Sequence, residues 1–437
     1  MSARLPSSVS GFPALNRLQR LDVRGVRLGL AAIDSVCERL GRPERRVPSV
    51  LVAGTNGKGS TAATLSSIGT AAGLRTGLYT SPHLVDVTER IRFGADDIAP
   101  EELDAVLGEV FAAADRAPAV PVTYFEAMTA AAFVAFARHG LELAILEVGL
   151  GGRLDATNVA PAILAVVTSI SLDHVEDLGP TVAKIAFEKA GIFRAGRPAL
   201  VASRLPEALA VFDDAARQTG AGLHRMVDET RVIADESLVS GTRFRLITPE
   251  RSYDLATPLA GPHQAENAAT AVRAAELLAP EFRIDSEAVV RGVAAVRWPG
   301  RLEGFTVRGK TVLVDGCHNA DGAAALATFI AGAGLGPDLV FGAMADKDIE
   351  SMGVALSPVV RRIRLVPAGS PRGASPEELI RRFAPGRRDA SAASGLAAAL
   401  EELLADPSSE TIIVAGSLYL VGEARSLLLS GRFSERP

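Results

Sequence analysis

Short apolar runs recur along the first two thirds of the chain, separated by segments in which apolar residues follow a helical spacing. Four runs are largely apolar and have the length of a buried strand: residues 49–53, 141–148, 162–168 and 198–202. A further short strand is expected at residues 75–80. The intervening segments at residues 60–72, 122–139 and 181–191 have the apolar spacing of helices. Continuous apolar strands that alternate with helices are typical of a parallel sheet covered on both faces. The pattern therefore predicts an α/β fold.

The pattern changes twice farther along the chain. Residues 223–255 form short stretches in which apolar and charged residues alternate, which predicts a small antiparallel patch. Proline and glycine then interrupt the chain at residues 298–300, and a second series of strands and helices follows. We therefore expect a first domain of residues 1–297 and a second α/β domain of residues 301–437, joined by a linker at residues 298–300.

Length, composition and charge limit the class of protein. The chain has 437 residues, which is more than one ordinary domain, and 48% of them are apolar, which suffices for large cores. The net charge of −5 argues against binding of nucleic acid, which favours a basic face. Two cysteines, Cys37 and Cys317, make neither a disulfide framework nor a zinc set. The longest apolar run, residues 127–137, is shorter than the ~20 residues of a membrane-spanning helix, and the first residues lack the pattern of a signal peptide. We expect a cytoplasmic protein without a membrane role.

A glycine-rich turn follows the first predicted strand and leads into a helix. Its sequence is Gly54-Thr55-Asn56-Gly57-Lys58-Gly59-Ser60-Thr61. Backbone N–H groups of such a turn point at phosphate oxygens, and the lysine supplies charge at the terminal phosphates. A hydroxyl just inside the helix can bind Mg²⁺. The turn departs from the common pattern because Val52 stands where a glycine is usual and Gly59 separates Lys58 from Ser60. We predict a nucleotide-phosphate loop of an unusual subtype.

Polar side chains follow three of the predicted strands, at the edge where ligands of open α/β sheets collect. Ser81 follows the second strand, Glu147 ends a very apolar strand, and His174 follows the next one. A buried carboxylate must be paired or bound to metal, and Mg²⁺ prefers such hard oxygen ligands beside nucleotide phosphates. The alternatives are a structural ion pair of Glu147 with Arg153, a solvated His174 and a turn hydroxyl at Ser81.

Lys189 is placed on the apolar face of the predicted helix at residues 181–191. That face is defined by Val182, Ile185 and Ala186. Lys184 points away from it and can pair with Glu188 at the surface. A lysine that faces inward near a metal site either pairs with an anion or has a lowered pKa. The alternative is a lysine that extends to solvent from the last turn of the helix.

The second domain begins with another candidate site. Its first strand ends in Asp315-Gly316-Cys317-His318-Asn319, and Arg301 directly follows the predicted linker. An aspartate and a histidine at a strand end can contact a nucleotide or orient a carboxylate. The alternative is that Asn319 caps the next helix and its neighbours are incidental. Cys317 is expected to be a buried core thiol.

Taken together, these stretches resemble the folylpolyglutamate synthase/dihydrofolate synthase family, a branch of the Mur-type ATP-dependent amide ligases. The loop at residues 54–58 is shared across the wider Mur group. The motifs that are more specific to the folate branch lie at residues 80–84, 89–92, 147–158, 188–192, 263–268, 298–303 and 342–348. The resemblance spans about residues 16 to 425. Cys317, where the family more often has alanine, is a departure without central consequence.

The resemblance implies an N-terminal domain of the P-loop NTPase type with a parallel sheet, a Rossmann-like C-terminal α/β domain, and ATP between them. It implies that ATP is bound by Gly57, Lys58, Gly59, Ser60, Asn267, Arg301 and Asp315. It implies two Mg²⁺ sites with ligands from Ser60, Ser81, Glu147, His174 and Lys189, the last being carbamylated by CO₂. The implied catalytic residues are Lys58, Lys189, Arg301 and His318. The implied pterin or folate contacts are Thr123, Tyr124, Phe125, Glu126, Leu154, Asp155 and Ala156, with Tyr124 and Phe125 offering aromatic surface for stacking.

The implied reaction adds L-glutamate to dihydropteroate, to folate polyglutamates, or to both, through an acyl phosphate, and releases ADP and phosphate. The expected partners are these small molecules, and the family leans towards monomers. Two alternatives are a cell-wall peptide ligase of the Mur group and, from another class, a P-loop phosphotransferase or NTPase switch. The absence of an obvious UDP-binding leading domain weighs against the first, and the second would leave the second domain and Lys189 without a purpose.

Overall fold

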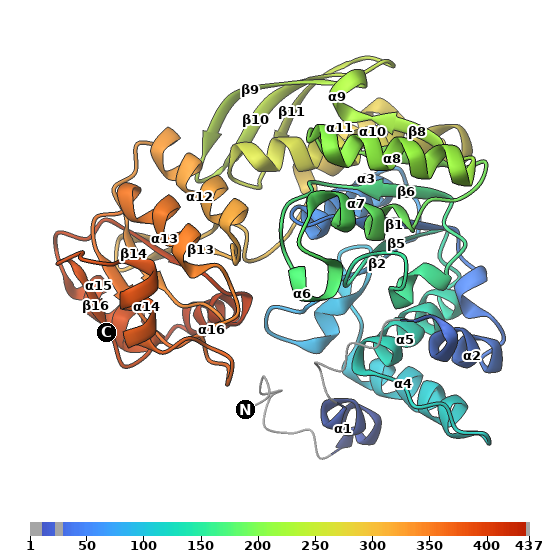
Figure 1. Cartoon of the computed structure of the whole chain (residues 1–437), viewed down its shortest axis with the longest axis horizontal. Helices are drawn as coiled ribbons and strands as arrows, with labels where there is room; N and C mark the ends of the chain where they lie inside the picture. Colours follow the sequence, from blue (N-terminus) through green and yellow to red (C-terminus); the bar gives the residue numbers. More distant parts are fainter. Residues whose placement is uncertain (1–10, 22–28, 434–437) are drawn as a thin grey trace.

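The computed structural model describes residues 11–21 and 29–433, which form two α/β units and a small antiparallel sheet (Figure 1). The strands of the first unit are β1 (Ser49–Ala53), β2 (Thr76–Tyr79), β3 (Ile91–Phe93), β4 (Asp96–Asp97), β5 (Leu143–Glu147), β6 (Leu164–Val167), β7 (Pro198–Val201) and β8 (Gly222–Arg225). They form one sheet in the order β4-β3-β2-β5-β1-β6-β7-β8, in which all pairs from β2 to β8 are parallel. The predicted parallel α/β fold is confirmed.

Both faces of this sheet are buried, as the continuous apolar strands require. Along β1, Leu51 and Ala53 face one core while Val50 and Val52 face the other, because successive side chains of a strand point to opposite faces. The first core is covered by α1 (Pro13–Arg20), α2 (Ala31–Arg39), α4 (Pro100–Asp115), α5 (Tyr124–Arg138), α7 (Val182–Ala190) and α8 (Pro206–Thr219). The second is covered by α3 (Lys58–Ala71), α10 (Pro262–Phe282) and α11 (Ser286–Ala295). Two short helices, α6 (Val175–Leu178) and α9 (Met226–Glu229), complete the unit.

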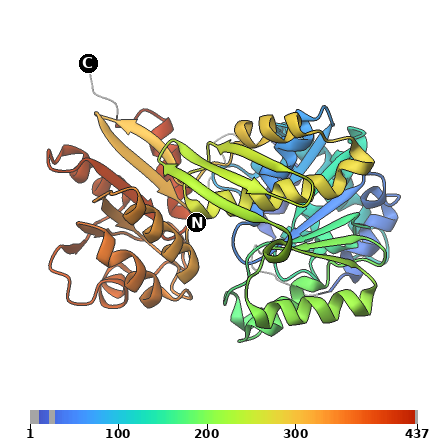
Figure 2. The ribbon, with the colours of Figure 1, turned by 90° about the horizontal axis from the view of Figure 1, so that it is seen from above.

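The antiparallel patch is present, but it begins later than the sequence pattern predicted. Residues 222–225 form β8, which pairs in parallel with β7 at the edge of the main sheet. The antiparallel strands are β9 (Arg231–Leu238), β10 (Gly241–Ile247) and β11 (Ser252–Thr257). Figure 2 shows them reaching from the first unit towards the second. Val239, at the turn after β9, packs against the core of the second unit, so this sheet helps to hold the units together.

The second unit is a six-stranded sheet with helices on both sides. Its strands are β12 (Glu303–Val307), β13 (Lys310–Asp315), β14 (Asp338–Phe341), β15 (Ile363–Leu365), β16 (Ala390–Ala392) and β17 (Thr411–Ala415), in the order β12-β13-β17-β14-β15-β16. Its helices are α12 (Ala320–Gly332), α13 (Ile349–Leu356), α14 (Pro376–Phe383), α15 (Leu396–Ala405) and α16 (Leu418–Leu429). Only the edge strand β12 runs antiparallel to its neighbour. In the part of the chain that the structure describes, no helix has the length and apolar character needed to cross a bilayer.

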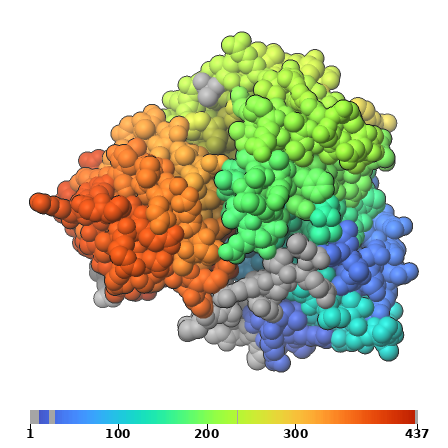
Figure 3. Space-filling view, viewed as in Figure 1, coloured from blue at the N-terminus to red at the C-terminus, as the bar shows by residue number. Residues whose placement is uncertain are grey.

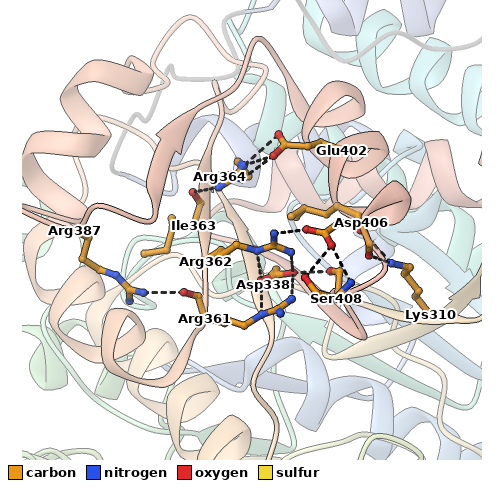
Figure 4. A network of polar contacts seen from close by, with 12 residues as sticks. Lys310, Asp338, Arg361, Arg362, Ile363, Arg364, Arg387, Glu402, Asp406 and Ser408 are labelled. Atoms are coloured by element: carbon orange, nitrogen blue, oxygen red, sulfur yellow. Dashed lines mark hydrogen bonds and ion pairs between the residues drawn. The ribbon is translucent and has the colours of Figure 1, made fainter.

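A buried aspartate is the centre of a network of polar contacts at the amino end of β14 (Figure 4). Asp338 begins β14, and its carboxylate accepts hydrogen bonds from Arg362 at 2.7 and 3.0 Å and from Arg361 at 2.8 and 3.1 Å. The Ser409 hydroxyl also donates to it. Burial acts to raise the pKa of Asp338, but the two guanidinium groups and the hydroxyl together lower it below its usual range. The charged carboxylate therefore stabilises the second unit.

Replacing Asp338 by asparagine is expected to destabilise the second unit by about 1–3 kcal/mol, because Arg361 and Arg362 lose a charged acceptor. Glu402→Gln is the matched control, since Glu402 pairs with Arg364 but is half exposed; that change is expected to cost only about 0–1 kcal/mol. Urea unfolding measures both. Because the folded pKa of Asp338 is depressed, its contribution is full at pH 7 and is lost as the pH falls through the folded pKa. Equal effects of the two substitutions at pH 7 would contradict this assignment.

Candidate active site

A cavity of about 560 Å³ lies where the two units meet, and the seam between them is visible in the space-filling view (Figure 3). It is walled by the carboxyl ends of β1, β2, β5 and β6 on one side and by the carboxyl end of β13 on the other. Twelve residues predicted from the sequence line it: Gly57, Lys58, Gly59, Ser60, Ser81, Glu147, His174, Lys189, Asn267, Arg301, Asp315 and His318. The seven predicted pterin contacts, Thr123, Tyr124, Phe125, Glu126, Leu154, Asp155 and Ala156, do not line it.

The phosphate loop is already shaped for an anion. Gly57 caps α3 with a φ of 85°, in the left-handed region that favours glycine, and a side chain there would also collide with Asn267. The ammonium of Lys58 folds back and donates to the carbonyls of Gly54 at 3.0 Å and Thr55 at 3.1 Å. The N-terminus of α3 and the lysine charge therefore face the cavity together, an arrangement that suits phosphate groups.

Glu147 is the last residue of β5 and is buried, with 6% of its surface exposed. Its Oε2 accepts a hydrogen bond from the backbone N–H of Ser81 at 3.1 Å. Burial raises the pKa of this carboxyl, and the nearby charges of Lys58 and Arg301 oppose that rise. The carboxylate thus lies between the phosphate loop and a cation of the second unit.

Two ion pairs that the sequence analysis considered do not form in the structure. The guanidinium of Arg153 pairs with Glu188 at 2.8 Å, so the alternative ion pair between Arg153 and Glu147 is wrong. The predicted pair of Lys184 with Glu188 is replaced by the same contact, because the loop after β5 brings Arg153 against α7. Glu147 is therefore left facing the cavity.

Lys189 faces inward, as the spacing in its helix predicted. It lies on the buried face of α7 with Ile185 and Ala186, and only 4% of its surface is exposed. Its Nζ donates to the carbonyl of Gly54 at 2.8 Å, and no carboxylate among the described residues lies within ion-pair distance of it. Burial, reinforced by the Lys58 charge, lowers the pKa of Lys189 to about 7. A large fraction of this amine is therefore neutral at physiological pH.

The candidate metal ligands fit a hard divalent cation in their chemistry. Glu147 offers a carboxylate, Ser60 and Ser81 offer hydroxyls, and the half-exposed His174 offers a ring nitrogen. Within residues 11–21 and 29–433 no three side chains of His, Cys, Asp or Glu come close enough to form a metal site by themselves. Because Glu147 and His174 are the only residues of these types in the predicted set, a complete shell needs hydroxyl groups, phosphate oxygens, water or a modified Lys189.

In the second unit, a strand-end aspartate holds the loop that carries His318. The carboxylate of Asp315 accepts from the N–H groups of Leu302 and Cys317, both at 3.0 Å. His318 Nδ1 lies 2.9 Å from the carbonyl of Gly316, so the neutral ring donates from Nδ1 and keeps its lone pair on Nε2. Burial lowers the pKa of His318 to about 4. The buried Cys317 thiol has a raised pKa, as expected of an unreactive core thiol.

A polar contact between the units involves a residue that the sequence did not single out. Asp173 of the first unit pairs with Lys347 of the second at 2.7 Å and accepts from Asn319 at 3.1 Å. Asn319 also exchanges hydrogen bonds with Asn56, at 3.0 and 3.3 Å, and it caps α12, as the alternative interpretation of this stretch had it. Burial acts to raise the pKa of Asp173, but Lys347 and the neighbouring histidines lower it strongly. The position of Asp173 in the loop that follows β6, beside His174, was the signal that could have identified it.

Removing the charge of Lys347 while keeping most of its length, as in Lys347→Met, is expected to loosen this contact between the units. Truncating one partner of a buried charge pair usually costs at least about 2 kcal/mol, so the two units should separate more readily. Small-angle scattering should then give a larger radius of gyration, and KM for the substrates should rise. Asp346→Asn is the matched control, because Asp346 is exposed and its nearest basic group is 4.0 Å away. Unchanged dimensions of the Lys347→Met protein would contradict a role in closure.

The predicted pterin side begins with a capped helix. The Thr123 hydroxyl accepts from the N–H of Glu126 at 3.2 Å, and the Glu126 carboxylate accepts from the N–H of Thr123 at 2.8 Å. This capping box starts α5. The ring of Tyr124 is buried and lies beneath the guanidinium of Arg90, at 5.1 Å. Of the two aromatic side chains that the sequence offered for stacking, Phe125 is the more exposed: it is half-buried, whereas Tyr124 is buried.

Phe125 and Asp155 adjoin the cavity through the loop after β5. A Cβ on Gly149 would lie 2.6 Å from the Phe125 ring, so the ring covers this glycine. The carboxylate of Asp155 accepts from the N–H groups of Gly149 at 3.0 Å and Leu150 at 2.9 Å. Gly149 and Leu150 themselves line the cavity. A flat ligand bound against Phe125 would therefore adjoin the cavity at Gly149 and Leu150.

Comparison with known proteins agrees with this geometry. The family model described as Mur ligase middle domain matches residues 52–275, and the one described as Mur ligase, glutamate ligase domain matches residues 300–418. The dihydrofolate synthase/folylpolyglutamate synthase of Bacillus subtilis is 36% identical, covering 92% of this chain and 96% of its own length. That of Escherichia coli is 34% identical, with 97% of each chain covered.

Solved structures agree as well. Escherichia coli FolC in complex with DHPP and ADP has a TM-score of 0.86 at 34% identity, over 96% of this chain and 97% of that one. Mycobacterium tuberculosis folylpolyglutamate synthase with ADP and AMPPCP has a TM-score of 0.86 at 35% identity, over 97% and 99%. The cell-wall ligase and the NTPase switch that the sequence left open are not favoured. The chain belongs to the Mur ligases and, within them, to the folylpolyglutamate synthase/dihydrofolate synthase family of ATP-dependent ligases that form carbon–nitrogen bonds.

Proposed function

We propose that this enzyme adds L-glutamate both to dihydropteroate and to reduced folates, with ATP as the energy source. The observation that carries the proposal is a shared cavity in which the phosphate loop, Glu147 and Lys189 face Arg301, Asp315 and His318 of the other unit. ATP would lie across this seam, with its triphosphate on residues 57–60 and its nucleoside contacted by Asn267, Arg301 and Asp315. The relatives from Bacillus subtilis and Escherichia coli carry both names, which supports the double activity.

The reaction would proceed in two steps. A carboxylate oxygen of the pterin substrate attacks the γ-phosphorus, the bond from that phosphorus to ADP breaks, and an acyl phosphate forms. The amino group of glutamate then attacks the acyl carbon, phosphate leaves, and the nitrogen loses its proton to form the amide. Lys58 and Arg301 would stabilise the negative charge on the transferring phosphoryl group from opposite sides of the cavity. Their preorganised positions are the main contribution of the protein to the first step.

The residues present fit a divalent cation, which would neutralise phosphate charge when bound. Glu147 would be its principal ligand, helped by the hydroxyls of Ser60 and Ser81 and by His174. A bifunctional folylpolyglutamate synthase/dihydrofolate synthase with Mn, AMPPNP and L-glutamate bound is 32% identical, with a TM-score of 0.82 over 95% of this chain and 97% of that one. That structure supports a metal here.

We further propose that Lys189 reacts with CO₂. Its neutral amine adds to the carbon of CO₂ and releases one proton, giving an anionic carbamate. This modification would turn a buried cation into a hard oxygen ligand next to Glu147 and the phosphate loop. The burial of Lys189, the lack of a carboxylate partner for it within residues 11–21 and 29–433, and its pKa of about 7 support this proposal.

On the acceptor side, Phe125 would stack on the pterin ring, with Thr123, Tyr124, Glu126 and residues 154–156 shaping that pocket. His318 would accept a hydrogen bond, or the proton, from the attacking amine at Nε2, which lies 4.0 Å from the Asp173 carboxylate. We expect the enzyme to act in the cytoplasm as a monomer on small molecules.

The test uses the purified full chain with ATP, glutamate and either dihydropteroate or tetrahydrofolate. Release of phosphate should depend on both glutamate and a pterin, and mass spectrometry should show addition of one glutamate to each acceptor. Activity with only one acceptor would overturn the double activity. Phosphate release without glutamate would overturn the ligase assignment altogether.

A further inference from the structure

The unusual glycine of the phosphate loop lies against the tryptophan that precedes the second unit. Gly59 is in the first turn of α3, and a Cβ there would lie 2.5 Å from Cζ2 and 2.9 Å from Cε2 of Trp298. Real Cβ atoms are not found at such distances from ring carbons, so only glycine permits the contact. The glycine that interrupts the usual loop pattern is therefore explained by its neighbour.

The indole is held in place on its other sides too. Trp298 packs against the second core of the first unit, and the guanidinium of Arg92 lies 5.4 Å from its ring centre. Its Nε1 is shielded from solvent and has no hydrogen-bond partner among the described residues. A buried indole N–H without a partner has an energetic cost, so no hydrogen bond holds the ring in this position. Packing against Gly59 and the core must therefore maintain it.

The residues that directly follow Trp298 are anchored in the second unit. The N–H of Gly300 donates to the Glu303 carboxylate at 2.9 Å, and its carbonyl accepts from the N–H of Gly316 at 2.8 Å. Arg301 donates from Nη1 to the same carbonyl at 3.0 Å, and its guanidinium lies directly against Gly316. One short segment therefore touches the phosphate loop at one end and carries Arg301 at the other.

We propose that Trp298 is a positioning residue of the ligase reaction: its contact with Gly59 sets the position of Arg301 relative to the phosphate loop. The contact couples the first turn of α3, where the terminal phosphates would lie, to the guanidinium that faces them from the second unit. This inference rests on the role proposed above for Arg301. A misplacement of about 1 Å between reacting groups can cost about 10²-fold in rate, so such an alignment has a measurable effect.

The first experiment monitors the contact between Gly59 and Trp298 by fluorescence and does not depend on enzyme activity. Trp298 is the one tryptophan of the sequence, so the intrinsic fluorescence of the full chain reports on this site alone. Gly59→Ala should shift the emission to longer wavelength, because the added methyl group displaces the indole. Gly108→Ala is the matched control: Gly108 is also helical but exposed, with open space around it, and its emission should stay unchanged. An unchanged emission of Gly59→Ala would overturn the proposal.

The second experiment measures coupling through a double-mutant cycle in the glutamate-dependent reaction. Gly59→Ala is expected to lower kcat by about 10²-fold, with little change in KM for glutamate. Trp298→Phe removes the ring atoms that the methyl group meets, so the double variant should recover at least about tenfold in kcat over Gly59→Ala. If the activation free energies lost in Gly59→Ala and in Trp298→Phe simply add in the double variant, the methyl group acts on the phosphates directly. The proposal is then wrong. If the wild type lacks this reaction, the proposed function fails while the fluorescence result still decides the contact.

Discussion

Lys189→Ala is expected to lower glutamate-dependent phosphate release by about 10³-fold, the upper end of the effect of losing one preorganised electrostatic contact. Lys189 is buried beside the phosphate loop and donates only to a backbone carbonyl among its described contacts. Its removal would delete the carbamate oxygen that we place next to Glu147. Short-chain carboxylic acids such as acetate should restore part of the activity, because they can occupy the emptied space and supply a carboxylate.

The control for this variant lies on the same helix. Lys184→Ala removes an exposed lysine of α7 and should leave kcat unchanged. NMR after incubation with ¹³CO₂ should show a carbamate signal in the wild type and none in Lys189→Ala. Since the pKa of Lys189 is lowered to about 7, the reactive neutral amine predominates above that pH, and carbamylation should decline as the pH falls below it. Wild-type activity in Lys189→Ala, or a carbamate signal that persists in it, would remove the modification from the mechanism.

Arg301→Ala is expected to lower kcat by about 10²–10³-fold, because it removes the guanidinium that we propose stabilises the transferring phosphoryl group. Arg301 lines the cavity and lies close enough to Glu147 to oppose the rise in its pKa. Single-turnover measurements of acyl-phosphate formation separate this step from product release. Arg301→Lys should recover only part of the rate, since lysine keeps the charge but not the planar pair of donors.

Arg297→Ala provides the matched control for Arg301. Arg297 directly precedes Trp298 in the same segment, but its side chain is exposed and outside the cavity. Its loss should leave kcat and KM close to those of the wild type. If Arg297→Ala and Arg301→Ala were equally impaired, the effect would come from the segment and not from the guanidinium at the cavity.

The strands and the chemistry at their ends could be predicted because both are local properties of the sequence. The apolar run that became β1 is buried on both faces, and the glycine-rich turn after it forms the expected cap of α3. The inward position of Lys189 followed from the helical spacing of its neighbours. The start of the antiparallel patch was misplaced because residues 222–225 form a short, half-buried strand at the edge of a sheet. In such a strand apolar and polar side chains alternate in the same way whether its neighbour is parallel or antiparallel.

Pairings between distant residues could not be predicted. Asp173 meets Lys347 across 174 positions, and Arg153 meets Glu188 in place of the expected Lys184. Such contacts depend on how whole elements pack, and a charged side chain at a strand end has several possible partners until that packing is known. The contact of Tyr124 could not be predicted either: its ring lies against the guanidinium of Arg90 within the protein.

By itself, the sequence determined that the protein has two α/β units, a nucleotide-phosphate loop, an inward lysine and the motifs of a glutamate-adding ligase. These follow from burial periodicity and from the chemistry of short motifs. Only the tertiary structure decided that Glu147 is free of Arg153, that Asp173 joins the units, and that Gly59 must be glycine because Trp298 lies against it. The physical reason is close packing: the distant indole lies so near the loop that a Cβ on residue 59 would be 2.5 Å from it, and this approach depends on the arrangement of the whole fold.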